Sequence, residues 1–348
     1  MRVRYSRQSV GDLAGSIEQL ARVRAVEATD GPARGSRLYI VENGGGLAFT
    51  VNADRGFDIT DCTFSGIPVA WRSAVGDVHP SYAGDGEARL LRAFTGGLFF
   101  TAGYTQFGAA CTDDGHFLPQ HGWATFLPAM SVRIENGWEG DNYRLRLSGE
   151  VRQSRLFGEC ITLRRTYETE LGSDCFWIED VLKNDGAHPT PHMMLYHFNF
   201  GFPLIAPGTE IVMNVASTTP RDAVAAAGLS QALRMSEPEA NFPEQVFLHE
   251  LTPGEDGFGS VAIENHGIGM ALRLDFDMST LPYLYQWKVS EQGTYVLGIE
   301  PANCKGIGGR TEARSNGSLQ MLQAGEEVRY RLKATFGISP RLAISNCQ

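Results

Sequence analysis

The chain has 348 residues, of which 43% are hydrophobic and 20% are charged, and 40 acidic against 30 basic residues give a formal net charge of −10. This acidic balance argues against a surface that follows the phosphates of DNA or RNA, and the hydrophobic content allows a large buried core. No stretch approaches the roughly 18 to 20 apolar residues needed to cross a bilayer, and the N-terminus lacks an apolar signal core. We therefore expect a cytoplasmic protein with no nucleic-acid or membrane partner.

Helical patterns are few along the chain. Residues 1–15 are expected to form a loose N-terminal arm. Helical periodicity is confined to 16–23 and to 221–233, where the sequence reads RDAVAAAGLSQAL. Because strands and helices do not alternate regularly, a parallel α/β sheet is disfavoured. We expect only a few short helices.

Strand patterns dominate the rest of the chain. Alternating or β-branched and aromatic runs occupy 36–43, 46–53, 66–73, 143–151, 160–169, 175–184, 192–200, 269–276, 295–300 and 327–336. Turn-forming residues such as ENGGG and NDGAHPTP separate these runs. No linker or short repeat divides them. The prediction is an all-β fold, a large antiparallel β-sandwich, with residues 16–348 forming a single domain.

Three polar residues stand out because their surroundings are apolar or glycine-rich. His121 lies in LPQHGWATFLP, His197 lies in MMLYHFNFGFPL, and Glu300 ends the apolar run YVLGIE. Taken singly, such a histidine is more often a hydrogen-bonded core residue and such a glutamate a solvated rim charge. Burying a carboxylate is costly without a partner, however, and His and Glu offer complementary acid and base roles near neutral pH. Together they indicate a proton-transfer site.

Several segments resemble the signature blocks of the aldose 1-epimerases, the galactose mutarotase-like superfamily. These are GGLFFTAGYTQFG at 96–108, LPQHGWA at 118–124, YHFNFGFPL at 196–204 and YVLGIEPAN at 295–303. Their order and spacing match the family from about residue 30 to the C-terminus. DRGFDIT and PVAWRS further resemble a less characterised aldose-epimerase-like branch.

The resemblance implies a role for each matching residue. His197 would be the acid that protonates the ring oxygen of a sugar, and Glu300 would be the base that takes the proton from its C1 hydroxyl. His121 and Gln286 would bind the substrate, as would Asn199 in the turn beside the acid, and the single domain would be a sugar-binding one. If acid and base act on opposite sides of one pyranose, we expect roughly 5 to 8 Å between His197 and Glu300. No cofactor or metal is implied.

Two departures from the family bear on the ligand. The arginine before the glycine pair is replaced by Thr95, with Arg92 as the nearest substitute, and the arginine that often ends the HGxxR block is Thr125. Because arginines suit recognition of anions, their absence favours an uncharged sugar over a sugar phosphate. Lys288, two residues after Gln286, is a further candidate for contact with the sugar.

Other functions stay open at this point. A non-catalytic carbohydrate-binding or regulatory protein would use the same fold and cleft, but it would need no acid and base. An isomerase or lyase acting on an acidic sugar would require a basic cleft, for which Arg89, Arg92 and Lys288 are candidates. The scattered His and Glu residues make metal binding a minor alternative. The assembly state is also open, with a homodimer as one option.

Overall fold

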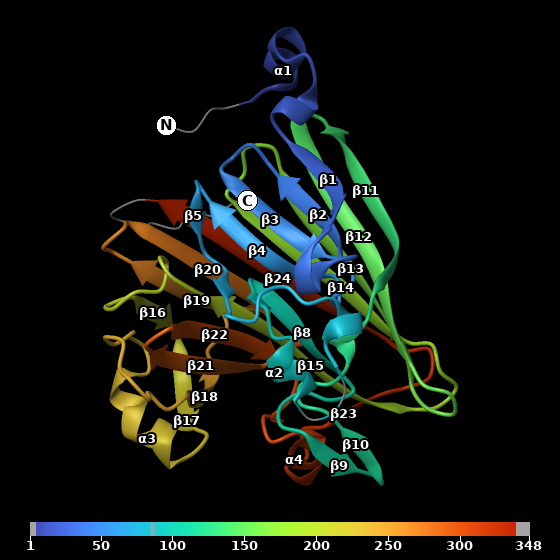
Figure 1. The fold of residues 1–348 in the computed structure, drawn as a ribbon, viewed down its shortest axis with the longest axis vertical. Coiled ribbons are helices and arrows are strands. Elements are labelled where there is room, and N and C mark those ends of the chain that lie inside the picture. Colours follow the sequence, from blue (N-terminus) through green and yellow to red (C-terminus); the bar gives the residue numbers. More distant parts are fainter. Residues whose placement is uncertain (1–4, 85, 87, 339–348) are drawn as a thin grey trace.

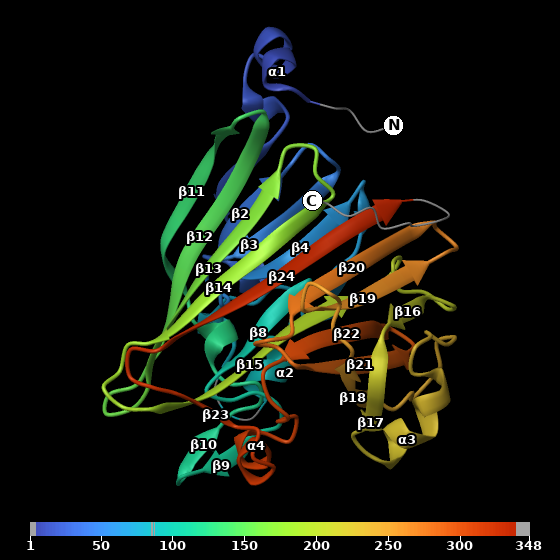
Figure 2. The same cartoon turned by 180° about the vertical axis from the view of Figure 1, so that it is seen from behind.

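The computed structural model describes residues 5–84, 86 and 88–338, and two large sheets dominate it (Figures 1 and 2). The first sheet contains, in spatial order, β1 (Arg22–Glu27), β2 (Arg37–Glu42), β3 (Leu47–Asn52), β4 (Asp58–Phe64), β8 (Phe99–Tyr104), β15 (Thr190–Phe200), β22 (Thr294–Ala302), β21 (Tyr283–Glu291), β18 (Gln245–Leu251) and β17 (Val215–Pro220). The short strands β5 (Ile67–Pro68) and β23 (Gln320–Leu322) pair with β4 and β15.

The second sheet is made of the longest hairpins. Its spatial order is β11 (Ala129–Glu139), β12 (Asn142–Ser154), β13 (Cys160–Glu170), β14 (Cys175–Asn184), β24 (Glu327–Ile338), β20 (Met270–Asp277), β19 (Phe258–Asn265) and β16 (Glu210–Met213). Neighbouring strands pair antiparallel, as β12 does with β13 and β21 with β22. The predicted all-β class and antiparallel sandwich are confirmed.

The remaining elements are short. Two small ladders join β6 (Trp71–Arg72) to β7 (Gly96–Gly97) and β9 (Cys111–Asp113) to β10 (His116–Leu118). The α-helices are α1 (Arg7–Leu13), α2 (Arg89–Arg92), α3 (Ala223–Gly228) and α4 (Arg310–Ser315). The 3-10 turns are η1 (Ile17–Gln19), η2 (Gly31–Ala33), η3 (Pro80–Tyr82), η4 (Ala124–Phe126) and η5 (Leu229–Gln231).

The helix predictions succeed at one place and fail at another. The expected helix at 221–233 is found as α3 followed by η5. The expected helix at 16–23 is wrong, because the chain makes only the turn η1 there before β1 pairs with β2. Pairing with a neighbouring strand has overridden a weak local preference. Within the expected arm, Ser6 and Ser9 form a capping box at the start of α1. The boundary of the arm at residue 15 stays a prediction.

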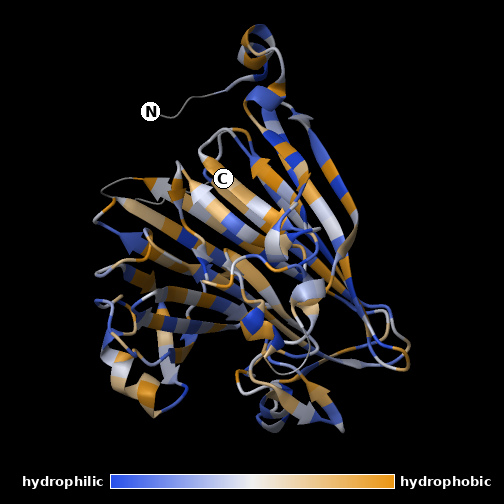
Figure 3. Cartoon of the chain, in the orientation of Figure 1, coloured by the Kyte–Doolittle hydropathy of each residue, from blue (hydrophilic) through white to orange (hydrophobic). Residues whose placement is uncertain are grey.

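The core fills the space between the two sheets. Along β12, buried and more exposed residues alternate, as the two-residue period of a strand requires, and Figure 3 shows similar banding on other strands. Phe49 of the first sheet packs on Phe176 of the second with ring centroids 4.9 Å apart, and Phe64 stacks on Phe336 at 5.4 Å. In the described part of the chain, no helix is long and apolar enough to cross a membrane.

A fully buried ionic cluster also lies between the sheets. The guanidinium group of Arg165 on β13 donates to Asp180 on β14 at 2.6 Å and to Asp58 on β4 at 2.8 Å. It also donates to the hydroxyl of Thr101 on β8, and the Tyr196 hydroxyl on β15 donates to Asp180 at 2.6 Å. The cluster therefore ties five strands of the two sheets together through charge-assisted hydrogen bonds.

Candidate active site

The site begins with two strands in the middle of the first sheet. On β15, His197 lies opposite Phe100 of β8, and on β22, Glu300 lies opposite Tyr285 of β21. Side chains alternate between the faces of a strand, so Tyr196 points to the core and His197 points away from it. Glu300 projects from the same outer face. The register thus brings together two residues that are 103 positions apart in the printed sequence.

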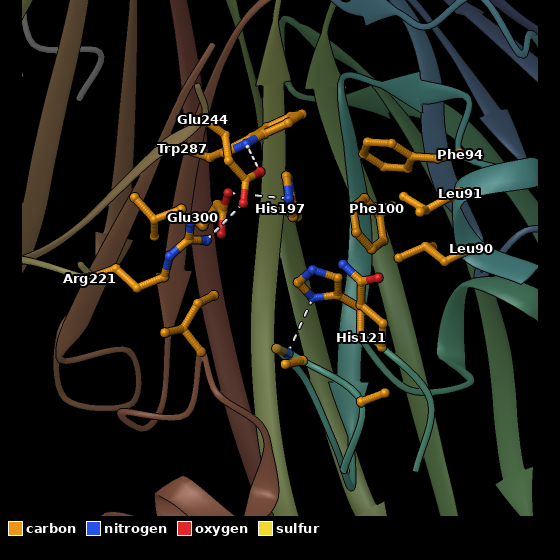
Figure 4. A pocket seen from close by; sticks show the side chains of 16 residues that line it. Leu90, Leu91, Phe94, Phe100, His121, His197, Arg221, Glu244, Trp287 and Glu300 are labelled. Carbon is orange, nitrogen blue, oxygen red and sulfur yellow. Dashed lines mark hydrogen bonds and ion pairs between the residues drawn. The ribbon is translucent and has the colours of Figure 1, made fainter. Parts of the chain in front are cut away.

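These side chains line a cavity of about 460 Å³ on the outer face of the sheet. Its polar lining consists of Gln120, His121, His197, Arg221, Glu244 and Glu300. Figure 4 shows His197 between Glu300 and Phe100, with His121 close by and Phe94 and Leu91 on the side opposite Arg221. The His197 and Phe100 rings are stacked with centroids 4.6 Å apart. Of the residues that the resemblance assigns to the sugar site, His121, His197 and Glu300 line this cavity and Gln286 does not.

The distance between the two central groups differs from the expectation. His197 Nε2 lies 3.2 Å from Glu300 Oε1, so the predicted separation of roughly 5 to 8 Å is wrong. That prediction placed a whole sugar ring between acid and base. The ring oxygen and the hydroxyl oxygen of a hemiacetal are bonded to the same carbon, however, so two groups that serve them have to lie close together.

Burial shapes the protonation of this pair. Burial raises the pKa of Glu300 to about 8, and the nearby Glu244 carboxylate adds to this. Burial also lowers the pKa of His197 well below its ordinary value, and His121 lowers it further. Since burial disfavours each charged form, a protonated Glu300 beside a neutral His197 is the favoured state near neutral pH. The pair then holds one proton.

Both members of the pair have hydrogen-bonding capacity to spare. The contact between them has the distance of an ion pair but not the geometry of a hydrogen bond, and within the described residues Glu300 Oε1 and His197 Nδ1 have no hydrogen-bond partner. Buried polar atoms are normally satisfied, so unpaired ones need an explanation. Because these atoms lie at a cavity wall, a ligand that supplies hydroxyl groups to pair with them would explain their burial.

A glycine makes room for the Glu300 carboxyl group. A Cβ atom at Gly298 would lie 2.6 Å from Glu300 Oε1 and 2.9 Å from Cβ of Trp287. Contacts this short do not occur between real Cβ atoms and their neighbours, so any larger residue at this position would displace the carboxyl group or the indole. Gly298 therefore belongs to the site although it offers no functional group.

Arg221 and Glu244 form a polar edge that sequence reasoning missed. Glu244 accepts hydrogen bonds from the Trp287 indole at 3.0 Å and from Arg221 at 3.0 Å, and Arg221 also donates to Asp222 at 2.9 Å. Both residues lie in segments between strands, where an arginine and a glutamate read as ordinary solvated charges. Trp287, whose indole donates to Glu244, also lines the cavity.

The backbone holds His121 firmly. Its φ of 57° lies in the left-handed region, which is uncommon for a residue other than glycine. Its N–H donates to Gly108 O at 2.9 Å, and Gly108 N–H donates to its Nδ1 at 3.3 Å. Burial lowers the pKa of His121 to about 4. A neutral imidazole that accepts at Nδ1 carries its proton on Nε2, so His121 can donate one hydrogen bond.

Gln286 and Lys288 lie on the wrong face of β21, which corrects the expectation that they contact the sugar. Gln286 pairs with Ile299 rather than with Glu300, so it points away from the cavity. It accepts from His249 Nε2 at 2.9 Å and donates to Ala232 O at 2.7 Å. The Lys288 ammonium group donates to two backbone carbonyls at 2.7 Å each, and burial lowers its pKa to about 8.

Asn199 and Arg92 also fall outside the cavity lining. Asn199 is on the same face of β15 as His197, but β7 covers it: its amide nitrogen donates to His197 O at 2.9 Å and to Gly96 and Gly97 at 3.4 Å each. It therefore supports the strand instead of reaching a ligand. Arg92 is exposed at the end of α2 and does not line the cavity. Both substrate-contact expectations are corrected.

The lining carries little free charge and no metal-binding cluster. Within the described part of the chain, Arg221 is the single lysine or arginine that lines the cavity, and two carboxylates already engage it. Over the same residues, no group of three or more His, Cys, Asp or Glu side chains is arranged to hold a metal ion.

Comparison with known proteins gives a family and a fold. Residues 33–336 match the profile of a family described as a domain of unknown function, DUF4432, while none of the curated proteins is significantly similar. The fold is similar to that of a candidate aldose 1-epimerase from Klebsiella pneumoniae, at 25% identity and a TM-score of 0.88, over 93% of this chain and 87% of that one.

Two further solved structures share the fold. A galactose mutarotase-like protein from Clostridium acetobutylicum is 12% identical, with a TM-score of 0.61, over 92% of this chain and 99% of that one. The galactose 1-epimerase of Lactobacillus acidophilus is 12% identical, with a TM-score of 0.60 and the same coverage. The resemblance to the galactose mutarotase-like superfamily that the sequence predicts is confirmed.

Proposed function

The chain belongs to the DUF4432 family, and from its fold and its site we propose that it interconverts the two anomers of an uncharged aldose. One observation carries the proposal. His197 Nε2 and Glu300 Oε1 lie 3.2 Å apart in the wall of a cavity, and both side chains keep polar atoms that have no hydrogen-bond partner among the described residues. A protein that only binds a sugar has no need to bury such a pair.

The reaction uses the pair as acid and base on one carbon. Glu300 as carboxylate takes the proton from the C1 hydroxyl group while protonated His197 donates to the ring oxygen. The bond between C1 and the ring oxygen breaks, and the C1 hydroxyl becomes an aldehyde. After rotation about the bond between C1 and C2, the same transfers in reverse close the ring as the other anomer. Atoms and protons balance without a cofactor.

The protonation of the site fits this cycle. When the ring is open, Glu300 carries the proton and His197 is neutral, which is the state that burial favours. When the ring is closed, the proton has to lie on His197, whose Nε2 lies 3.2 Å from Glu300 Oε1. The two arrangements of one proton correspond to the open and closed forms of the sugar.

The remaining lining supports an uncharged ligand. Arg221 is already engaged by Glu244 and Asp222, so the described residues that line the cavity offer no free pair of cations for a phosphate group. His121 can donate a hydrogen bond to a sugar oxygen, and the Trp287 indole offers an apolar face. These features favour an aldose over an acidic sugar or a sugar phosphate.

The test is to measure exchange between anomers by saturation-transfer NMR over a panel of aldoses, with binding followed separately by calorimetry. Glu300→Gln keeps the shape of the side chain and removes the base, and His197→Asn removes the acid. Each should slow exchange by about a hundredfold or more, while binding falls far less. Glu179→Gln, on the outer surface of β14, is the matched control and should leave exchange unchanged.

One outcome would favour the alternative of a carbohydrate-binding protein. If an aldose binds well to the wild type but its anomers exchange no faster in the presence of the wild type than in the presence of Glu300→Gln, the protein does not catalyse mutarotation. The cavity would then serve recognition alone, and the buried pair would need a different explanation.

A further inference from the structure

A second cavity, of about 480 Å³, lies beside the first and is similar in size. Its walls come from the β9–β10 ladder, the end of β12 with the turn that follows it, and the start of α4. Figure 1 shows β9, β10 and α4 grouped at one end of the molecule. The segment that carries Gln120 and His121 into the first cavity carries Phe117 and Trp123 into the second. The two cavities thus share a loop.

One wall of the second cavity is aromatic and accessible. Phe117 is 49% exposed and Trp123 is 37% exposed, although both are large apolar side chains. The guanidinium carbon of Arg89 lies 5.6 Å from the centre of a Trp123 ring, which supports the indole. Exposed aromatic rings that border a cavity are suited to stacking on the apolar face of a sugar.

The opposite wall is cationic. Arg152 and Arg155 are about half exposed, at 47% and 49% of their side chains, and both line the cavity. Arg152 Nε donates to the Thr162 hydroxyl at 3.1 Å, and the guanidinium group lies 3.9 Å from Asp185. Arg155 Nε donates at 3.3 Å to Glu159, the one acid in the lining that the structure describes, and Arg155 Nη1 lies 3.4 Å from His116 Nδ1. Each guanidinium group keeps further N–H groups beyond these contacts, and such groups are suited to binding a carboxylate.

The next residue of β12 is a buried amide with an unused acceptor, on the opposite face of the strand from Arg152. Gln153 is only 4% exposed, and its Nε2 donates to Thr105 and to Glu159 at 3.1 Å each. Its Oε1 has no hydrogen-bond partner among the described residues. An unpaired buried acceptor is costly, so a hydroxyl donor from a ligand would compensate it, if the amide shifts slightly to meet it.

From these three features we infer that the second cavity binds a monosaccharide that carries a carboxylate, such as a uronic acid. The aromatic rings take the face of the sugar, Arg152 and Arg155 take the carboxylate, and Gln153 takes a hydroxyl group. This ligand differs in charge from the aldose proposed for the first cavity, where the one arginine is already neutralised. The inference does not depend on the chemistry of His197 and Glu300.

Two tryptophans make the cavities distinguishable in one experiment. Trp123 lines the second cavity and Trp287 lines the first, so their indole N–H signals in a proton–nitrogen NMR spectrum report on each cavity separately. Trp123→Phe and Trp287→Phe assign the two signals. D-Glucuronate is the probe, D-glucose is the neutral comparator, and acetate is an anion without a sugar face.

Glucuronate should shift the Trp123 signal, whereas glucose and acetate should shift it much less at equal concentration. Combining Arg152→Gln with Arg155→Gln should weaken glucuronate binding by about tenfold or more and leave anomer exchange at the first cavity unchanged. Arg164→Gln, an exposed arginine on neighbouring β13, is the control and should bind as the wild type does.

Three results would overturn the inference. A shift confined to Trp287 would show that glucuronate enters the first cavity. An equal response to acetate would show a site for simple anions. Binding that is unchanged in the double arginine variant would remove the proposed carboxylate contact. Anomer exchange is measured in the same samples, so failure of this inference and failure of the proposed function give different results.

Discussion

Two clusters of ionisable side chains lie on opposite faces of β15, one residue apart along the strand. On the core face, Tyr196 joins Arg165, Asp58 and Asp180 in a cluster whose ion pairs are 2.8 and 2.6 Å long. On the outer face, His197 meets Glu300 at 3.2 Å, and both retain atoms without a partner. Both clusters are buried. They differ in how completely their polar atoms are satisfied.

This difference distinguishes buried polar groups that stabilise the fold from buried polar groups that are available to a ligand. A paired buried charge is costly to disturb and holds a unique arrangement, whereas an unpaired one costs stability and persists where another molecule uses it. Stability and activity should therefore respond in opposite ways when each cluster is changed.

The largest expected effect follows from removing the cation of the core cluster. Arg165→Met leaves Asp58 and Asp180 buried without their partner, so the free energy of unfolding should fall by about 3–5 kcal/mol. Urea denaturation measures this. Arg164→Gln, on the same strand but exposed, should change it by no more than about 0.5 kcal/mol. Equal losses in the two variants would mean that the core cluster is not the special feature we describe.

Changing the outer pair should have the opposite effect on stability. The pKa of Glu300 in the folded protein, about 8, lies above its ordinary value of 4.5. The stability that the protonated carboxyl group contributes is therefore fully present below pH 4.5 and is lost as the pH rises through 8. Glu300→Gln does not ionise. Relative to wild type, its free energy of unfolding should gain up to about 1.4 kcal/mol per pH unit across this range. A constant difference between the two proteins from pH 5 to pH 8 would contradict the raised pKa.

The same titrations set the pH range of activity. The pair holds one proton between the lowered pKa of His197 and the raised pKa of Glu300, so exchange should be flat through neutral pH and should fall above about pH 8, by about tenfold per unit. The rate is measured by NMR after subtraction of the uncatalysed exchange. A rate that already falls between pH 7.5 and 6 would show that His197 titrates in its ordinary range.

The smallest expected effect concerns Arg92. It is exposed and does not line the cavity, so Arg92→Ala should leave both KM and the exchange rate of an aldose unchanged. The variant tests whether Arg92 contacts the sugar, since Arg92 is the arginine nearest to Thr95, which replaces the arginine expected before the glycine pair. A clear rise in KM would return Arg92 to the site.

The sequence predicts the strands that have a clear alternating or β-branched and aromatic pattern. It also predicts the functional residues that are polar but lie within apolar segments. The run at 175–184 coincides with β14 to the residue, and His197 and Glu300 are recognisable as polar side chains in apolar strands. Strands such as β11 and β18 were missed because their sequences are mixed. Their positions depend on pairing with distant partners.

The wrong predictions within the site share one cause: the residue types suit sugar binding, but their positions in the fold depend on contacts that are distant in sequence. Gln286 was assigned to the cavity, but a shift of one residue along β21 reverses the face on which a side chain lies. Asn199 has the right face but is covered by β7, and that covering segment comes from about 100 residues earlier in the chain. Arg221 and Glu244 reach the cavity from segments between strands. No local pattern records such long-range placement.

The Arg165 cluster also bears on the order in which the molecule folds. Its members come from β4, β8, β13, β14 and β15, so they cannot meet until a span of more than a hundred residues has been brought together. Contacts this distant in sequence form slowly, because the entropy of closing long loops is lost before they compensate for it. We expect the cluster to form late, as the two sheets dock. Until then we expect Arg165 to stay hydrated, because burying its charge without Asp58 and Asp180 would be costly. Water should therefore leave the space between the sheets only when the cluster forms.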